Sequence, residues 1–412
     1  MIARRAPTPK AYEGDGGARH TTHLRGLNLD RVLGVAMSRP GSFTRAELVH
    51  ATGLSAPTVG SLTADLIGAG LLKDLGTGPS RGGRRPAVME FNARHGFIAA
   101  IDMGPTRTRL AVADLRGDQL AHRIVPTQSQ LTPGALLGRL ARSVRVLMKE
   151  AGAPMDGLLA VAAGAPGAVD YERGIVSLAP NLPGWAQVPM RDTLERALPT
   201  RVLVENDVNL AVMGEHATGA ARGHDSCLFI HVGTGIGAGI MIDGEVHRGN
   251  HFQAGEIALM CMGPQYAEQS YGSRGCLETL AGLQAMAGAW PPASTADPRW
   301  LAELFDAAHD GDRAAQRVVD DTTRLLGIAI ANACTVVDPS MVVLGGALFA
   351  QAEHLIHEVR KIVLRFSRAP AEIVVSALGK EAPLQGGLLL AVNEARRQLR
   401  LGLREGRLSA VS

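Results

Sequence analysis

Asp207 is the residue of this chain whose type and position best suit catalysis by proton transfer. A β-branched segment ends at Glu205, and Asn206 and Asp207 follow it where a helix is predicted to begin. A carboxylate at the carboxyl end of a strand lies where α/β sheets place their chemistry. There it could remove the proton of a hydroxyl group while a phosphoryl group is transferred to that oxygen. An aspartate before a helix is also a common N-cap, and the spacing leaves both interpretations open.

Two segments with the same strand–turn–strand pattern carry glycine-containing turns. They span residues 97–118 and residues 227–246. The turn residues are Asp102, Gly104 and Thr106 in the first segment, and Gly233, Thr234, Gly235 and Gly237 in the second. Glycine lets backbone N–H groups reach an oxyanion, so two such turns facing a cleft would hold nucleotide phosphates. Each turn leads into a strand rather than a helix, which excludes a dinucleotide-binding fingerprint.

The elements that precede these segments predict a helix-turn-helix. Three helices are expected, with inward-facing residues Leu29, Val32, Leu33 and Ala36 in the first and Val59, Leu62 and Leu66 in the third. Asn28 is a candidate cap for the first helix. Thr44 and Glu47 have capping-box spacing at the second helix, Gly53 would end it, and Ser55 would cap the third. Two helices joined by a short glycine-containing turn are typical of DNA-binding proteins.

The third helix has small outward-facing residues that suit DNA recognition. They lie near its amino-terminal end and are Ser55, Pro57, Thr58 and Ser61. Small polar groups there can approach base edges in a major groove. A predicted β-hairpin follows, and its glycine-rich tip carries Arg81, Arg84 and Arg85, which can contact a minor groove or phosphates. The alternative is a three-helix packing module with a solvated hairpin.

The distribution of charge favours the DNA-binding interpretation. Residues 1–94 carry 13 Lys and Arg against 7 Asp and Glu, a net charge of +6, whereas the rest of the chain has a net charge of −3. A basic region on a slightly acidic body suits an anionic polymer as its partner, although charge alone leaves a chance excess open. Together, the helices, the hairpin and the charge predict binding to double-stranded DNA.

The composition is typical of an α/β protein of the cytoplasm. Hydrophobic residues make up 46% of the chain and charged residues 20%, and there are 49 glycines. No apolar run reaches the ~18 residues of a membrane span, and the amino-terminal segment lacks the apolar core of a signal peptide. Four scattered cysteines do not make a disulfide framework. We expect a cytoplasmic, nucleoid-associated protein with no membrane partner.

From about Asn28 to Glu394 the chain resembles the ROK family, which groups bacterial sugar kinases with sugar-responsive repressors, and nine motifs carry the resemblance. In chain order they are AIDMGPT, GAPGAVD (164–170), NLPGW, VENDVNLAVMGE, VGTGIGAGI, AGEI (254–257), RGCLET (274–279), VVLGGAL (342–348) and GGLLLAV (386–392). The resemblance implies an α/β fold in which a two-lobed, actin-like (ribonuclease H-like) domain binds sugar between its lobes. The helix-turn-helix head is typical of the family's transcriptional-regulator branch.

The resemblance also implies roles for individual residues. Four of them would contact sugar hydroxyls: Asn206, Asp207, Glu256 and Glu278. In a kinase, Asp207 would be the general base. The turns at Asp102, Gly104 and Thr106 and at Gly233 to Gly239 would match the two phosphate motifs, and Gly345 and Gly346 would match the adenosine loop.

Several positions depart from the family pattern. Leu259 stands where the family has a histidine that binds zinc and touches sugar, and Gln269 and Tyr271 replace the first two cysteines of a zinc knuckle. Cys276 remains, and a single thiol cannot hold structural zinc against solvent. Pro105 replaces a glycine of the first phosphate motif and removes one N–H donor. We therefore expect no metal and no other cofactor.

Two functions fit these observations. The first is a DNA-binding regulator, a repressor of carbohydrate uptake or catabolism genes that a small carbohydrate effector releases from operator DNA, acting as a homodimer or homotetramer. The second is an ATP-dependent sugar kinase that retains Asp207 as its base. The DNA-binding head, Leu259, Pro105 and the degenerate knuckle favour the regulator and predict that the protein is not an enzyme.

The same patterns predict the domain boundaries. We expect a disordered tail over residues 1–24 and a winged helix-turn-helix domain over 25–92. The first lobe would span residues 96–206 together with about 385–405, and the second lobe residues 207–384.

Overall fold

A computed structural model of the chain describes residues 16–78, 85–179, 182–272, 274–293, 297, 299–350 and 353–404. The chain divides into two compact units. Unit 1 includes the chain up to His95 and again from Ala395, and unit 2 runs from Gly96 to Glu394. Within the described residues, no helix is both long enough and apolar enough to cross a bilayer.

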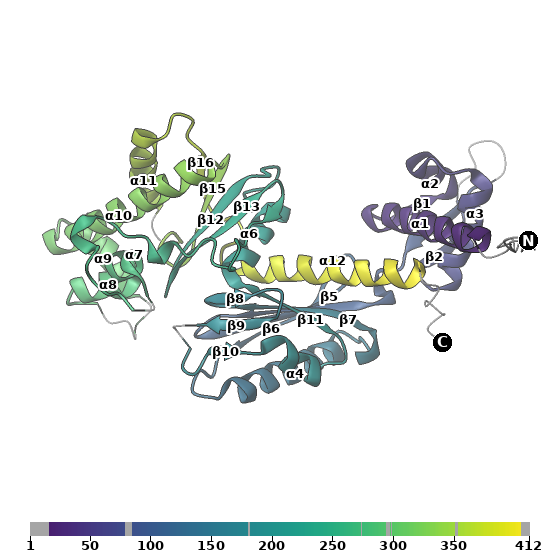
Figure 1. Cartoon of the computed structure of the whole chain (residues 1–412), viewed down its shortest axis with the longest axis horizontal. Helices are drawn as coiled ribbons and strands as arrows, with labels where there is room; N and C mark the ends of the chain where they lie inside the picture. The colour runs from purple at the N-terminus through teal and green to yellow at the C-terminus, as the bar shows by residue number, and fades with distance from the viewer. Residues whose placement is uncertain are drawn as a thin grey trace, which may run out of the picture. The chain divides into compact units, whose positions relative to one another are not determined.

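In its described residues, unit 1 contains three complete helices, the carboxyl-terminal end of α12 (Ala382–Arg404) and a small antiparallel sheet with strand order β1-β3-β2 (Figure 1). Its elements are α1 (Gly16–Ser38), β1 (Ser42–Thr44), α2 (Arg45–Thr52), α3 (Ala56–Gly68), β2 (Leu72–Thr77), β3 (Ala87–Phe91) and the 3₁₀ turn η1 (Ala93–His95). The predicted inward faces of α1 and α3 are buried, and Leu48 of α2 and Phe43 of β1 complete their core.

Capping fixes the helix-turn-helix as the sequence predicts. The Thr44 side chain accepts a hydrogen bond from the Glu47 N–H, and the Glu47 carboxylate accepts one from the Thr44 N–H, so the capping box is confirmed. Gly53 ends α2 in the left-handed region with φ +66°, where a residue with a Cβ would be strained. The Ser55 hydroxyl accepts from the Thr58 N–H at 3.3 Å and caps α3.

Three predictions for this region are wrong. Helix α1 begins at Gly16, so residues 16–24 are not a disordered tail and Asn28 is not a helix cap. The guanidinium of Arg25 bonds Ser61 and Asp65 of α3, a tertiary contact that composition cannot reveal. The chain from Ala395 belongs to unit 1 rather than to the first lobe, and Arg400 there pairs with Asp30 of α1 at 3.1 Å.

The first lobe of unit 2 is built on a five-stranded sheet with strand order β11-β7-β4-β5-β6. Its elements are β4 (Phe97–Met103), β5 (Arg107–Asp114), β6 (Gln119–Pro126), α4 (Pro133–Glu150), η2 (Met155–Gly157), β7 (Leu158–Ala165), β8 (Ala168–Asp170), β9 (Ile175–Leu178), β10 (Ala186–Val188), α5 (Met190–Ala197) and β11 (Arg201–Asn206). Every residue of β4 is buried, as expected for a central strand covered on both faces. Strands β8 to β10 form a separate small sheet.

The second lobe repeats this plan with strand order β14-β13-β12-β15-β16. Its elements are α6 (Asp207–Thr218), β12 (Cys227–Val232), β13 (Ile236–Ile242), β14 (Glu245–Val246), η3 (Ile257–Leu259), η4 (Pro264–Tyr266), α7 (Cys276–Ala281), α8 (Leu283–Ala289), α9 (Trp300–His309), α10 (Arg313–Val337), β15 (Met341–Gly345), α11 (Glu353–Phe366), β16 (Glu372–Val375) and η5 (Gly379–Glu381). Strand β12 pairs antiparallel with β13 and parallel with β15, as β4 pairs with β5 and β7. The predicted duplication of the strand–turn–strand segment is therefore confirmed.

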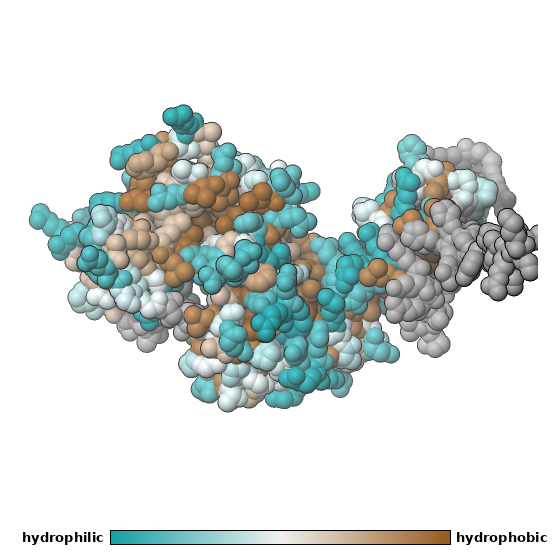
Figure 2. Space-filling view, viewed as in Figure 1, coloured by the Kyte–Doolittle hydropathy of each residue, from teal (hydrophilic) through white to brown (hydrophobic). Residues whose placement is uncertain are grey.

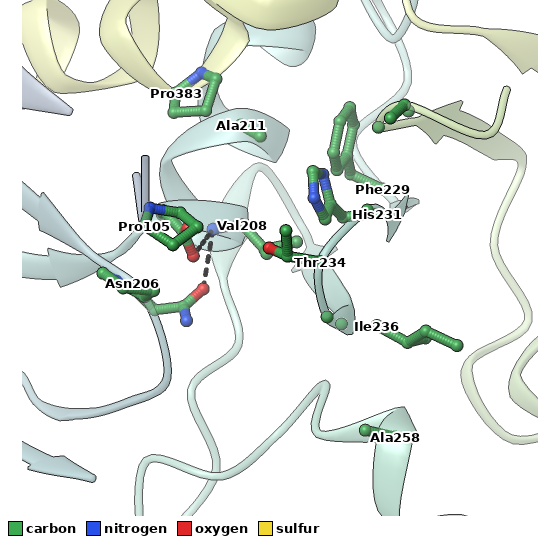
Figure 3. Close-up of a pocket in the computed structure, with 18 of the residues that line it drawn as sticks. Pro105, Asn206, Val208, Ala211, Phe229, His231, Thr234, Ile236, Ala258 and Pro383 are labelled. Carbon is green, nitrogen blue, oxygen red and sulfur yellow. Dashed lines mark hydrogen bonds between the residues drawn. The ribbon is translucent and has the colours of Figure 1, made fainter. Parts of the chain in front are cut away.

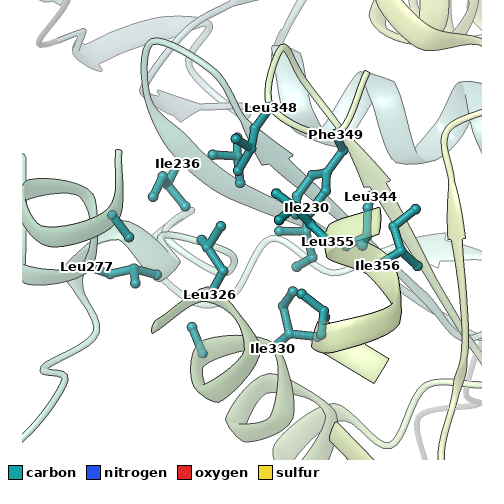
Figure 4. Close-up of a cluster of buried hydrophobic side chains, with 14 of the residues drawn as sticks. Ile230, Ile236, Leu277, Leu326, Ile330, Leu344, Leu348, Phe349, Leu355 and Ile356 are labelled. Atoms are coloured by element: carbon teal, nitrogen blue, oxygen red, sulfur yellow. The ribbon is translucent and has the colours of Figure 1, made fainter. Parts of the chain in front are cut away.

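Apolar packing holds the second lobe together. Figure 4 shows Ile230 of β12, Leu344 of β15, Leu326 and Ile330 of α10 and Leu355 of α11 meeting in one buried cluster. On the face drawn in Figure 2, hydrophobic residues gather on this lobe, whereas the first lobe is mostly hydrophilic.

Helix α12 (Ala382–Arg404) meets α6 at an unusually short distance. A Cβ on Gly386 would lie 1.8 Å from the Leu210 carbonyl oxygen, and a Cβ on Gly214 would lie 2.4 Å from that of Ala382. Glycine is therefore required on both helices, and backbone packs directly against backbone. This contact fixes the helix whose first residue is Asp207.

Candidate functional site

The two lobes of unit 2 enclose a cavity of about 570 Å³. Its size is within the range of small-molecule sites. Asn206, Asp207, Glu256 and Glu278 line it, as do the second glycine turn and Gly345 and Gly346. The structure thus brings together the predicted sugar-binding residues and most of the predicted phosphate-binding residues. Figure 3 shows one of each kind, Asn206 and Thr234.

Asn206, not Asp207, caps helix α6. The Asn206 side-chain oxygen accepts hydrogen bonds from the N–H groups of Val208 at 2.8 Å and Asn209 at 3.0 Å. Its amide nitrogen donates to the Gly167 carbonyl at 2.9 Å. The N-cap interpretation of Asp207 is therefore wrong, because the preceding residue already fills that role. Asp207 is the first residue of the helix and is available to a ligand.

Asp207 holds a proton at neutral pH. Burial in the cavity and the charge of the nearby Asp102 together raise the pKa of its carboxyl group from 3.8 to about 8, although the Val208 N–H bonds the carboxylate and opposes the shift. A neutral carboxyl group can donate a hydrogen bond to a ligand oxygen as well as accept one. It is a poor general base until a ligand or cation restores its charge.

This pKa predicts a pH-dependent stability difference for Asp207→Asn. Between pH 3.8 and about 8 the folded state holds a proton that the unfolded state has lost, so the stability of the wild type falls as pH rises through this window. Asparagine does not titrate, so the stability of the variant does not fall in this way. We expect the melting temperature of the variant, relative to wild type, to increase from pH 5 to 8 and then to level off. An exposed control, Asp320→Asn on α10, should show no trend, and a constant offset for Asp207→Asn would contradict the shifted pKa.

Glu256 and Glu278 add two carboxylates to the same end of the cavity. Burial raises the pKa of both groups, and the charge of Glu278 raises that of Glu256 further. The Ile236 N–H donates to the Glu278 carboxylate at 2.9 Å, which fixes that side chain at the start of α7. Leu259 lies beside them with 53% of its surface exposed, so the cavity wall is apolar where the resemblance implies a histidine.

The first glycine turn offers few donors to a phosphate. The Gly104 N–H is already bonded to the Arg107 carbonyl at 3.1 Å, and Pro105 has no N–H. Thr106 is exposed, and neither Gly104 nor Thr106 is among the residues that line the cavity, so their role in phosphate binding stays a prediction. Asp102 lies in the cavity wall, but it pairs with Arg109 at 3.2 Å. Burial still raises the pKa of Asp102 to about 6.

Arg109 also lines the cavity and is not among the predicted site residues, although hairpin register predicts its position. Asp102 and Arg109 are directly opposite in the antiparallel pairing of β4 and β5. A seven-residue separation around a tight turn places both side chains on one face of the sheet.

The second glycine turn lines the cavity together with an aromatic pair. Gly233, Thr234, Gly235 and Gly237 all contribute. Figure 3 shows His231 and Phe229 of β12 side by side near Thr234. Burial lowers the pKa of His231 to about 4, so its imidazole is neutral. Neither residue is predicted from the sequence, because a histidine or a phenylalanine within a buried strand carries no motif.

The far end of the cavity is formed by Gly345, Gly346, Lys380 and the loop before α12. A Cβ on Gly345 would lie 2.3 Å from the Phe229 ring, and one on Gly346 would lie 2.3 Å from the Val232 carbonyl oxygen. Packing alone therefore requires both glycines. The buried Glu215 of α6 holds this loop by accepting hydrogen bonds from Ser376 and the Leu378 N–H.

A buried ion pair links the two lobes beside Asp207. Two nitrogens of Arg248 donate to one oxygen of Glu205, each at 2.7 Å, and the Arg248 guanidinium lies 4.1 Å from the centre of the Tyr171 ring. The other Glu205 oxygen accepts from the Asn206 N–H at 2.9 Å and from the Asn209 side chain at 3.0 Å. The pair thereby positions the segment that carries the site.

The loop of the predicted degenerate zinc knuckle is held by ordinary contacts. Cys276 is buried at the start of α7, and the Tyr271 hydroxyl donates to the Gln269 side chain at 3.0 Å. Cys261 is exposed. Across the described part of the chain, no three metal-binding side chains cluster. That the protein binds no metal stays a prediction.

The residues predicted to contact DNA lie in unit 1. Ser55, Pro57 and Ser61 are exposed near the start of α3, and Thr58 is half-buried with its hydroxyl 2.8 Å from that of Ser55. Arg85 is exposed before β3, whereas Arg81 and Arg84 lie outside the described residues. Their roles in DNA binding stay predictions.

Comparison with known proteins adds three similarities. The putative xylose repressor of Caldicellulosiruptor sp. (strain Rt8B.4) is 30% identical over 336 residues, which cover 79% of this chain and 84% of that protein. The ROK hexokinase of Thermus thermophilus is 33% identical with a TM-score of 0.62, covering 73% of this chain and 99% of the hexokinase. A ROK family transcriptional regulator, a homologue of the E. coli MLC protein, has a TM-score of 0.73 at 24% identity and covers 94% of this chain and 99% of that one.

These similarities confirm the predicted fold class, an actin-like domain preceded by a winged helix-turn-helix domain. The sequence model of the ROK family matches residues 98–394, which include both lobes and the whole cavity. With the duplicated sheets and the cavity between them, this match establishes that the chain belongs to the ROK family.

Proposed function

We propose that the protein is a sugar-responsive, DNA-binding transcription regulator, a repressor that a carbohydrate effector releases from its operator. The observation that carries this proposal is the capped helix-turn-helix of unit 1, with the exposed start of α3 as its recognition surface. The hexokinase similarity accounts for 99% of that enzyme with only 73% of this chain, so unit 1 is additional to what a kinase needs. The similarity to a putative xylose repressor supports the same assignment.

In this proposal the cavity binds the sugar and does not phosphorylate it. Asp207, Glu256 and Glu278 hydrogen-bond the hydroxyls, and Asn206 holds Asp207 in place. The first glycine turn lacks free N–H donors at Gly104 and Pro105, which disfavours tight binding of a phosphate. To act as a switch, the sugar must bind two conformations of the protein with affinities that differ by about 1–3 kcal/mol. The regulator would act in the cytoplasm as a dimer or tetramer.

A sugar kinase is the second candidate. It is favoured by Asp207 beside the second glycine turn and by Gly345 and Gly346, which line the same cavity.

Two measurements on the full chain separate the candidates. We expect at least one sugar of a panel to raise the melting temperature, because a ligand of the native state stabilises it, and to weaken operator binding about fivefold or more. A coupled assay of ATP consumption with the same sugars should show no turnover. Turnover that Asp207→Ala abolishes would establish the kinase instead.

DNA binding should respond differently to two kinds of variant in unit 1. Arg85→Ala should weaken binding to all duplexes and reduce the dependence of log affinity on log salt by about 0.9, the value of one phosphate contact. Ser61→Ala should instead change the sequences that the protein selects from a random duplex pool. Arg142→Ala, an exposed arginine of α4 in unit 2, is the control. Equal effects of Arg85→Ala and Arg142→Ala would contradict the assignment of the DNA-binding surface.

A further inference from the structure

A second, smaller hollow lies beside the sugar end of the cavity. It has a volume of about 230 Å³, far more than the ~30 Å³ that one water occupies. Its lining is mostly polar and comes from both lobes: Asp170 of β8 and Ser177 of β9 lie on one side, and Asn250, His251, Phe252 and Gln253 on the other.

The walls of this hollow continue those of the main cavity. On the first lobe, Pro166 and Gly167 line the main cavity, and the next residue, Ala168, lines the hollow. On the second lobe, Glu256 lines the main cavity, and its N–H is bonded at 3.3 Å to the carbonyl of Gln253, which lines the hollow. A ligand bound at Asp207 therefore has a neighbouring space that a substituent can reach.

The chemistry of the hollow suits a sugar ring. Carboxylate, hydroxyl, imidazole and amide side chains can bond several hydroxyl groups in both directions, and an aromatic ring offers an apolar face. Asn250, His251 and Gln253 are exposed, so their side chains are accessible. Phe252 has φ +56°, a conformation that is costly for a bulky residue and that is concentrated at ligand sites.

We propose that this hollow is a second carbohydrate subsite, and that the effector is a disaccharide or longer oligosaccharide with one ring at Asp207 and the next ring in the hollow. The proposal rests on the proposed function, because it assumes that the main cavity binds a sugar. It identifies the class of effector as an oligosaccharide rather than a free monosaccharide.

Calorimetric titration of the full chain tests this proposal. The probes are D-xylose, D-glucose and N-acetylglucosamine, each beside its β-1,4-linked disaccharide. We expect one disaccharide to bind about tenfold more tightly than its monosaccharide, the gain from one net hydrogen bond. Asn250→Ala/Gln253→Ala should remove that gain and leave the monosaccharide affinity unchanged. Ser177→Leu, which fills the hollow from the opposite wall, should do the same.

Gln119→Ala, an exposed glutamine of β6 that lines neither cavity, is the matched control. Equal affinity for every disaccharide and its monosaccharide would overturn the subsite and leave the proposed function standing. The same conclusion follows if the variants weaken binding of both sugars alike. If none of the six sugars binds, the proposed function fails together with this inference.

Discussion

Asp207→Ala is expected to reduce the affinity for the effector roughly 5- to 150-fold, because the neutral carboxyl group can donate one hydrogen bond and accept another, and each contributes about 0.5–1.5 kcal/mol. The Asp207 carboxyl group lies in the cavity wall next to Glu256 and Glu278 and is not consumed by helix capping. The loss should be measured by titration with the sugar that gives the largest thermal shift, and the same sugar should no longer release operator DNA.

Asp320→Ala on α10 provides the comparison, since it removes an exposed carboxylate that does not line the cavity. DNA affinity in the absence of sugar should be the same for wild type and both variants. If Asp207→Ala binds sugar as tightly as wild type, the effector does not occupy this end of the cavity.

Arg248→Met is expected to lower the free energy of unfolding of unit 2 by about 3–5 kcal/mol, because it leaves a charge buried without a partner. Glu205 is 1% exposed and takes both of its Arg248 hydrogen bonds on one oxygen. Urea unfolding followed by tryptophan fluorescence measures this effect selectively, since all three tryptophans, Trp185, Trp290 and Trp300, are buried in unit 2.

An exposed ion pair of the same unit supplies the control. Lys361 and Glu358 lie 2.8 Å apart on α11 and are each about half exposed, so Lys361→Met should change stability by less than about 1 kcal/mol. Arg248→Lys should fall between the two, because it keeps the charge and loses the two-nitrogen geometry. If Arg248→Met lowers the free energy of unfolding no more than Lys361→Met does, the ion pair between Arg248 and Glu205 does not hold the segment that carries Asp207.

Local signals in the sequence were sufficient for the helix-turn-helix. The capping box at Thr44, the glycine at position 53 and the cap at Ser55 each act within four residues, and each forms as predicted. The start of α1 could not be predicted in the same way, because Arg25 stabilises it through residues of α3 about forty positions later in the chain.

In the site, spacing identified the residues but not their partners. Asn206 and Asp207 are adjacent, and which of them caps α6 depends on side-chain rotamers that no pattern encodes. The ion pair of Glu205 with Arg248 joins the two lobes, and its partners are 43 positions apart in the sequence. Register could have paired Asp102 with Arg109, whereas nothing in the sequence placed His231 in the cavity wall.

The glycine contact between α6 and α12 has a mechanical consequence. Side chains that separate two helices can change rotamer and so absorb a small displacement of one helix. At Gly214 and Gly386 no side chain separates α6 from α12. A shift of α6 when a ligand engages Asp207 must therefore move the first turns of α12 by nearly the same amount. Replacing either glycine with alanine would force the two backbones apart. A ligand-induced shift of α6 would then no longer be transmitted directly to α12.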